Sequence, residues 1–245
     1  MKKLMTLALL AGATICGTAS ATIINGTSLQ EQLDELGANI NVHTDQYQPD
    51  EQWVMNSTRL GAALLLFELA GYAPHNSFGI YDVLDPRRRL TIFAGGHSAG
   101  EQGALRLANA ATHGFCAGAF DEPFSCGNFG SNVFGFYLSN HYGTYFSESS
   151  LNPGAVDHMV AFEGGDGRGY IEDPMFRWEE NEFIFAWEDL AGGGDRDYDD
   201  FGVMVESVRA IPVSEPGTLA LLAGALIGAV LVRHALVRRR AATRA

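Results

Sequence analysis

From residue 71 onward, the chain alternates short apolar segments with clusters of glycine, asparagine and proline. The apolar segments are about as long as ordinary β-strands and are rich in aromatic and β-branched residues. They are Phe78–Val83, Leu90–Ala94, Asn132–Leu138, Asp157–Phe162, Glu182–Trp187 and Phe201–Val208. Many short strands separated by turns favour antiparallel sheets over alternating strands and helices. We therefore predict a mainly β fold, an antiparallel β-sandwich of the jelly-roll-like kind.

Two segments nearer the start of the chain have helical patterns instead. Over Ser28–Leu36, Ser28 can act as the N-cap, Glu31 follows three residues later, and three leucines share one face. A second apolar segment, Thr58–Ala70, ends at Gly71. Because glycine is common just after a helix, this segment predicts a second short helix.

The negative charge is concentrated in the body of the chain. Seven of the 16 basic residues lie at the two ends, among them Lys2, Lys3 and the Arg238–Arg240 cluster. Residues 22–215 keep nine basic residues, all of them arginine, against 29 acidic ones, which gives a net charge of −20. Because a body this acidic repels phosphate backbones, we exclude nucleic-acid binding driven by charge.

The N-terminus has the pattern of a secretory signal peptide. Two lysines precede the apolar segment Leu4–Ile15, and Ala19-Ser20-Ala21 is a small-residue cleavage site. We predict that residues 1–21 are removed, with cleavage after Ala21. A retained membrane anchor would need an apolar run of roughly 20 residues. Lipidation at Cys16 is disfavoured because Ile15, rather than a small residue, precedes it.

The C-terminus has the pattern of a membrane span. Residues 217–232 carry no charge, and Arg233 and the Arg238–Arg240 cluster follow them. A basic cluster at the end of a span stays in the cytoplasm. We predict a transmembrane helix over 217–232 and place the body of the chain on the other side of the inner membrane. A buried core helix is the alternative.

The residues before this span resemble a known sorting signal. Ser214-Glu215-Pro216, followed by the apolar segment and the arginines, resembles the PEP-CTERM sorting signal of Gram-negative bacteria over residues 213–240. Ser214 stands where that signal usually has its first proline. The resemblance implies processing by an exosortase-type enzyme, a transient anchor in the inner membrane, and then attachment at the cell surface or secretion. It also implies an association with exopolysaccharide or biofilm.

Two cysteines remain once the signal peptide is removed. Cys116 and Cys126 lie ten residues apart in an exported chain. Because an oxidising compartment favours disulfides, we predict that the two are bonded. Two free thiols are the alternative.

The densest group of potential metal ligands is an acidic segment that contains a run of three glycines. Six carboxylates fall within thirteen residues: Glu188, Asp189, Asp195, Asp197, Asp199 and Asp200. So many like charges repel one another unless a hard cation such as Ca²⁺, which takes six to eight oxygen ligands, neutralises them. An EF-hand is excluded because Asp200 stands where that loop needs glycine. We predict a calcium loop between two strands, and a solvated acidic hairpin is the alternative.

The same segment resembles a known family. Phe185-Ala186-Trp187-Glu188-Asp189-Leu190, followed by the glycine run and the alternating aspartates up to Asp200, resembles the signature of the DUF4114 family. The resemblance covers about residues 130–210 well and residues 22–130 more loosely. It implies a β-rich extracellular module with calcium binding and no established biochemical role.

One further motif points to a different function. Gly96-His97-Ser98-Ala99-Gly100 matches the turn that exposes the nucleophilic serine of α/β-hydrolases, with Asp121 or Asp157 and then His158 to complete a triad. No HGGG-type oxyanion loop precedes the motif, and the alternation of strands and helices that this fold needs is missing. We therefore interpret it as a glycine-rich turn between strands.

Together these patterns predict a non-catalytic exported protein whose extracellular domain spans residues 22–212. Ca²⁺ is the expected cofactor. The expected partners are an exosortase-type enzyme and extracellular polysaccharide, and the membrane itself holds the tail before processing. A calcium-dependent carbohydrate-binding module and a serine hydrolase acting through Ser98 are the two alternatives.

Overall fold

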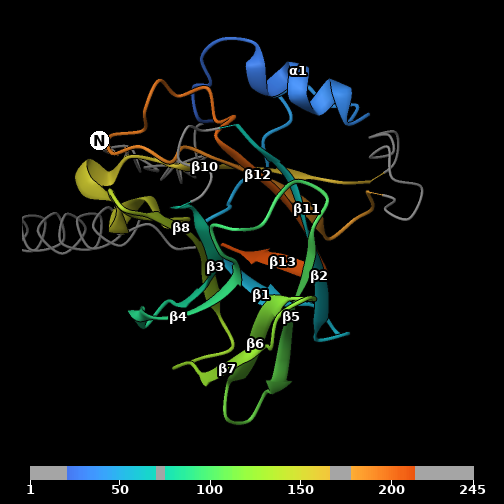
Figure 1. The fold of residues 1–245 in the computed structure, drawn as a ribbon, viewed down its shortest axis with the longest axis vertical. Coiled ribbons are helices and arrows are strands. Elements are labelled where there is room, and N and C mark those ends of the chain that lie inside the picture. The colour runs from blue at the N-terminus through green and yellow to red at the C-terminus, as the bar shows by residue number, and fades with distance from the viewer. Residues whose placement is uncertain (1–20, 70–74, 166–177, 213–245) are drawn as a thin grey trace, which may run out of the picture. The chain divides into compact units, whose positions relative to one another are not determined.

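The computed structural model describes residues 21–69, 75–165 and 178–212 (Figure 1). The segment Ala21–Val213 forms one compact unit. Within the described ranges, no helix is both long enough and apolar enough to span a membrane. The predicted signal peptide before Ala21, the sorting motif Ser214-Glu215-Pro216 and the predicted span over 217–232 lie outside these ranges.

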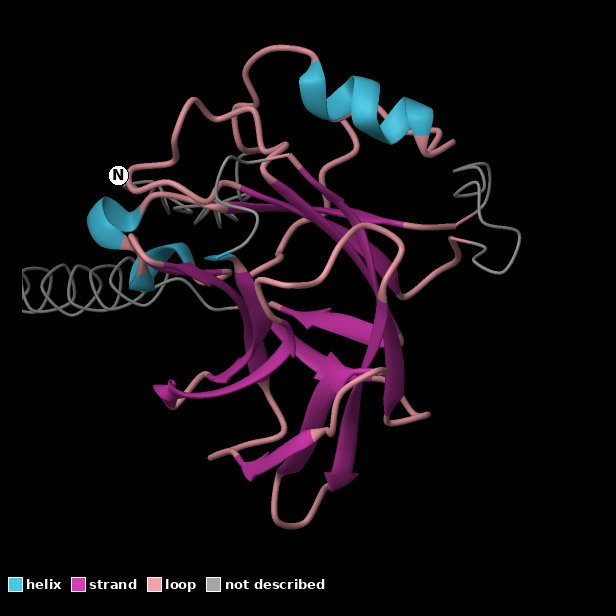
Figure 2. Cartoon of the chain, viewed as in Figure 1, coloured by secondary structure: helices cyan, strands magenta, loops and turns pink. Residues whose placement is uncertain are grey.

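The described residues form two antiparallel sheets, which confirms the mainly β prediction (Figure 2). The six-stranded sheet has the order β13-β1-β8-β3-β4, with β9 paired to β8. Its strands are β1 (Gln52–Met55), β3 (Ser77–Asp82), β4 (Asp85–Phe93), β8 (Phe134–Asn140), β9 (Gly143–Phe146) and β13 (Val208–Ile211). The seven-stranded sheet has the order β10-β11-β12-β2-β5-β6-β7. Its strands are β2 (Leu60–Glu68), β5 (Gln102–Asn109), β6 (Gly114–Ala119), β7 (Ser125–Asn128), β10 (Met159–Glu163), β11 (Glu182–Trp187) and β12 (Phe201–Glu206).

The main core contains side chains from both sheets. Alternate residues of the central strands contribute to it, because successive side chains of a strand point to opposite faces. Phe136 of β8 and Phe185 of β11 meet with ring centroids 4.6 Å apart. Trp53 of β1 makes edge contacts with both rings. These aromatic contacts hold the two sheets together as a sandwich, since large rings bury the most apolar area for each residue.

In the described part of the chain, one α-helix covers the other face of the seven-stranded sheet. Helix α1 (Ser28–Glu35) confirms the predicted element, and it buries Leu29 and Leu33. The predicted cap is wrong, because Thr27 takes the N-cap position and Ser28 is the first helical residue. The helix shares its apolar cluster with residues of four strands of the sheet, among them Val160 and Phe162 of β10, Ile184 of β11 and Met204 of β12. The sheet is therefore buried on both faces around β10, β11 and β12.

The predicted helix over Thr58–Ala70 is wrong, because the segment forms strand β2. Ala63 and Leu65 face the core between the sheets, whereas Leu64 and Leu66 face the cluster under α1. A strand covered on both faces has apolar residues at every position, and short apolar runs of this kind do not distinguish strand from helix by periodicity. The segment forms a strand because it pairs with β12 on one side and with β5 on the other.

The three arginines at 87–89 lie inside strand β4, which ends the six-stranded sheet. Arg88 lies 3.5 Å from the buried carboxylate of Asp82. The Arg89 guanidinium lies over the rings of Tyr137 and Phe146 on the outer face, 5.4 and 5.2 Å from their centroids. Charged side chains on an edge strand discourage pairing with another chain.

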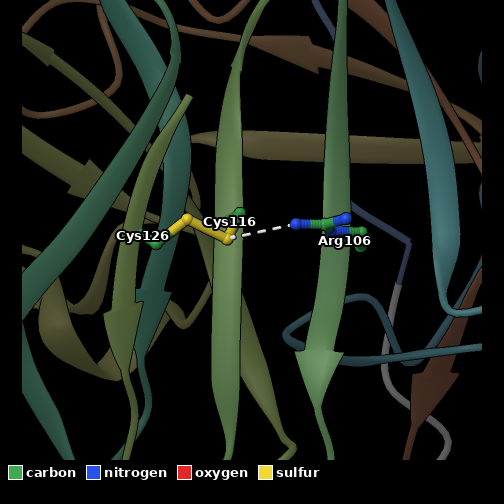
Figure 3. The surroundings of a disulfide bond; sticks show 3 residues. All are labelled: Arg106, Cys116 and Cys126. Carbon is green, nitrogen blue, oxygen red and sulfur yellow. Dashed lines mark hydrogen bonds between the residues drawn. A yellow bond between two sulfur atoms is a disulfide. The ribbon is translucent and has the colours of Figure 1, made fainter. Parts of the chain in front are cut away.

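A disulfide joins Cys116 of β6 to Cys126 of β7 (Figure 3). The two residues are directly opposite in the ladder, with their Cα atoms 4.1 Å apart. Figure 3 also shows Arg106 of the neighbouring strand β5, whose Nη2 lies 3.8 Å from the Cys116 sulfur. Strand β7 is the last strand of its sheet and is largely exposed, so the covalent bond holds a strand that buries little surface.

Candidate metal centre

The acidic segment forms the connection between β11 and β12. Glu188 directly follows β11, and its backbone N–H donates to the carbonyl of His158 at 3.0 Å, which extends the pairing with the β10 side of the sheet. Asp200 directly precedes β12. Because the two strands are neighbours in register, with Trp187 opposite Phe201, the intervening residues return on themselves at one end of the sheet.

Three carboxylates of this connection converge. One oxygen each of Glu188, Asp195 and Asp197 lies within 4.8 Å of the other two. Glu188 is completely buried, Asp197 is partly buried and Asp195 is exposed. The group is therefore a buried acidic cluster that opens to solvent on one side, and it can hold a metal ion.

The backbone of the connection is coiled tightly around Glu188. Residues in the left-handed region of backbone space are Gly192, Gly193, Gly194, Arg196 and Tyr198. Glycine adopts such angles without a steric cost. Gly194 must be glycine for a second reason, because a Cβ atom at this position would overlap Oε2 of Glu188. The glycine run thus lets the chain pass directly over the buried carboxylate.

The segment before α1 fixes the outer part of this connection. The Asn25 side chain donates to the carbonyl of Asp195 at 2.6 Å, and its backbone N–H donates to the carbonyl of Arg196 at 2.7 Å. The Ser28 hydroxyl donates to Oδ2 of Asp197 at 3.3 Å. Sequence reasoning missed the role of Asn25 and assigned Ser28 to a cap. Asn25 and Ser28 lie about 170 residues before the aspartates in the sequence, so no local pattern indicates that they contact them.

Glu188 is the member of the cluster with an unsatisfied charge. Its Oε1 accepts the backbone N–H of Tyr198 at 2.9 Å, whereas its buried Oε2 has no hydrogen-bond partner among the described residues. The pKa of Glu188 is raised to about 8, mainly by burial and in addition by the carboxylates of Asp200, Asp197 and Asp195, whereas the hydrogen bond from Tyr198 lowers it. A buried carboxylate oxygen without a partner is costly, so the site favours either a proton or a cation.

Asp189 and Asp200 belong to a different group. The Asn76 side chain donates to Oδ2 of Asp189 at 3.1 Å, and the Asp189 backbone N–H donates to Oδ2 of Asp200 at 3.0 Å. Burial, with Asp189 nearby, raises the pKa of Asp200 to about 7. Glu188 and Asp189 therefore have different partners, the backbone of Tyr198 for Glu188 and the side chain of Asn76 for Asp189. The sixth predicted ligand, Asp199, lies beside the cluster, with its backbone N–H 3.5 Å from Oδ1 of Asp197.

The Gly96–Gly100 motif lies in the connection between β4 and β5, as expected of a turn between strands. Ser98 is exposed there. His158 is fully buried, with its ring stacked on Tyr145 and its Nδ1 3.1 Å from the carbonyl of Glu188. Its Nε2 has no hydrogen-bond partner among the described residues. The structure therefore shows no hydrogen bond between Ser98 and the histidine proposed for it.

The raised pKa of Glu188 predicts how stability depends on pH when no metal is bound. An unfolded glutamate has a pKa of about 4.3. Because the folded pKa is about 8, the folded protein retains a proton that the unfolded chain loses between these values. This contribution to stability is fully present below about pH 4 and is lost as the pH rises through about 8. We expect the thermal midpoint in chelator to fall from pH 5 to pH 8.5.

The variant Glu188→Gln, which cannot ionise, should flatten that dependence. The matched control Glu35→Gln, at an exposed position at the end of α1, should retain it. A pH dependence that is the same in Glu188→Gln and in the unmodified protein would contradict the assignment.

Comparison with known proteins finds one family. Residues 113–208 match the model of a family described as a domain of unknown function, DUF4114. The match supports the resemblance stated above for residues 130–210 and begins further upstream. Neither the curated proteins nor the solved structures contain a match. The matched region runs from the start of β6 to the start of β13, and it contains both the disulfide and the whole acidic connection.

Proposed function

We propose that this protein is an exported, non-catalytic calcium-binding protein that acts at the cell surface or in the extracellular matrix. The observation that supports the proposal most strongly is that Glu188, whose buried Oε2 has no partner among the described residues, converges with Asp195 and Asp197. A cation at this point neutralises the three carboxylates and gives Oε2 the partner that it lacks.

The chemistry of the ligands favours calcium over other metals. The three converging groups offer oxygen only, which is the ligand set of hard cations, whereas zinc prefers histidine and cysteine. Calcium tolerates flexible and irregular coordination, whereas Mg²⁺ demands near-ideal octahedral geometry. A loop built from glycines and left-handed residues can add backbone carbonyls to an irregular site. Ca²⁺ is thus the ion that this site fits best.

Calcium would act here as a structural ion. The converging residues come from the end of β11 and from the outer part of the connection, which is itself bonded to Asn25 and Ser28. An ion bound by all three carboxylates would join the sheet to the segment that leads into α1. The bound form would then present an ordered surface at this end of the molecule, and its exposed Asp195 side would be the place for a ligand to approach.

The sequence patterns at the two ends supply the cellular part of the proposal. The signal peptide would export the chain, and the PEP-CTERM-type tail would hold it in the inner membrane until an exosortase-type enzyme processes it. The disulfide between Cys116 and Cys126 suits the oxidising compartment that this route provides. Extracellular polysaccharide is the proposed partner. A calcium-dependent carbohydrate-binding module is the second candidate, because an ion with an open side can orient sugar hydroxyls next to Asp195.

The sorting part predicts the mass of the mature protein. In the bacterium of origin, we expect protein recovered from the cell surface or medium to lack residues 1–21 and the chain beyond the Glu215-Pro216 pair. Intact-mass measurement and cell fractionation check this. Changing both Glu215 and Pro216 to alanine should keep the protein in the inner membrane. Wild-type protein that stays in the membrane with its tail intact would refute this part alone.

The calcium part predicts a binding-linked gain in stability. For the chain from Thr22 to Pro212, which contains both core clusters, calcium at a hundred times its dissociation constant should add about 2.7 kcal/mol. For a domain of this size, that gain corresponds to a rise of about 5–10 °C in the thermal midpoint relative to chelator. The variants Glu188→Gln and Asp197→Asn should lose most of this rise.

Two matched variants separate the structural assignment from a general effect of negative charge. Asp189→Asn removes a neighbouring charge on the other side of the chain, and Asp199→Asn removes one within the same connection. Both should keep most of the calcium-dependent rise. Equal loss in all four variants would show that calcium responds only to total charge, and no rise in the unmodified chain would overturn the calcium proposal.

A further inference from the structure

A second pair of carboxylates, the buried Asp50 and the half-buried Asp157, lies near the proposed calcium site: the Tyr198 backbone N–H donates to Glu188, and its hydroxyl donates to the carbonyl of Asp157. Asp50 precedes β1 and is 5 % exposed, and Asp157 lies two residues before β10. Oδ2 of Asp50 is buried and has no hydrogen-bond partner among the described residues. Burial raises the pKa of Asp50 well above its usual range, and the nearby Asp157 raises it further. The charge of Asp157, which is itself half-buried, therefore disfavours ionisation of the buried Asp50 carboxyl.

No positive charge compensates this pair in the described part of the chain. The ion pairs of the described residues involve Arg87, Arg88 and His97, all with other acids. Glu51 adds a third negative charge that raises the pKa of both aspartates. A pair of buried acids with an unpartnered oxygen needs a cation or a proton.

The backbone of Thr22 is held beside these acids. The Thr22 hydroxyl donates to Oδ2 of Asp157 at 2.5 Å. The Gln46 carboxamide holds the backbone of Thr22 from both sides: its Oε1 accepts the Thr22 N–H at 2.7 Å, and its Nε2 donates to the Thr22 carbonyl at 2.8 Å. Covalent geometry then places the Thr22 nitrogen within about 6 Å of the Asp157 carboxylate. An opposite charge at that distance favours the ionised carboxylate.

We propose that Asp157 and Asp50 form a binding site for the α-ammonium group of Thr22, which cleavage after Ala21 creates. The inference rests on the export proposed above. Hydrolysis of the Ala21–Thr22 bond adds the oxygen of water to the Ala21 carbonyl carbon and leaves an amine on Thr22. That amine takes a proton at neutral pH, because an α-amino group has an ordinary pKa of about 8.

Cleavage thereby converts one neutral N–H into three charged N–H donors at a fixed place. One donor can keep the hydrogen bond to Gln46, and the others can turn to the acidic pair. The uncleaved precursor has only an amide there, so its acids remain uncompensated. Removal of the signal peptide would thus stabilise the fold after export. The effect would extend to the calcium site, because Asn25, three residues after Thr22, holds the carbonyls of Asp195 and Arg196.

The composition of the chain makes this inference unusually easy to test. Lys2 and Lys3 are the only lysines, so the processed protein has a single primary amine, at Thr22. The full chain should be produced with its own signal in an exporting Gram-negative host, and the N-terminus identified by mass spectrometry. Acetylation of the processed protein with an N-hydroxysuccinimide ester at pH 7.5 should then be at least about fivefold slower in the native state than in urea, because only the unprotonated amine reacts.

Variants decide whether the acidic pair causes the protection. Asp157→Asn should raise the native acetylation rate severalfold, whereas Asp34→Asn, at an exposed position of α1, should leave it unchanged. If the Asp157→Asn variant does not fold, the wild-type protein can be acetylated in urea and then refolded as a substitute test. The thermal midpoint of this acetylated protein should lie below that of the unmodified protein. Native acetylation as fast as in urea, or protection that calcium abolishes, would overturn the inference.

A different N-terminus would refute the predicted cleavage after Ala21 without deciding the inference. In that case a fusion to residues 22–245, cut so that Thr22 becomes the first residue, gives the same single amine. The same acetylation measurements on that chain then confirm or overturn the inference by themselves.

Discussion

The carboxylate of Glu188 imposes the strictest local demand in this structure. It lies fully buried at the end of β11, with one oxygen bonded to the backbone of Tyr198 and the other lacking a partner among the described residues. The connection to β12 is shaped around it, since Gly194 must be glycine for the chain to pass over Oε2. Burying an unpaired carboxylate costs several kcal/mol, so such a group persists only where a proton or a cation resolves it.

The N-terminal segment is the second element on which the arrangement depends. It supplies α1, which covers the outer face of the seven-stranded sheet, and before that the residues that bond the acidic connection. Both groups of buried carboxylates therefore lie against the first ten described residues. The conformation of the calcium site and that of the N-terminal segment are consequently coupled, because both depend on the same short stretch of chain.

The sequence predicted the strands where turns and β-branched or aromatic residues mark them, as at Glu182–Trp187, which the structure reproduces with the same bounds. It failed at β2, because burial on both faces removes the alternation that identifies a strand. It identified the acidic connection but not the separation of Glu188 from Asp189, which depends on how β11 continues into the loop. The contributions of Asn25 and Gln46 come from tertiary contacts that no local pattern announces.

The most direct test of the central claim is a crystal structure of the mature protein grown with calcium, with a second crystal soaked in terbium to locate the ion by its anomalous scattering. We expect one ion bound by the carboxylates of Glu188, Asp195 and Asp197, with Oε2 of Glu188 among its ligands. An ordered connection without an ion at saturating calcium would contradict it. So would an ion bound only by Asp189 and Asp200.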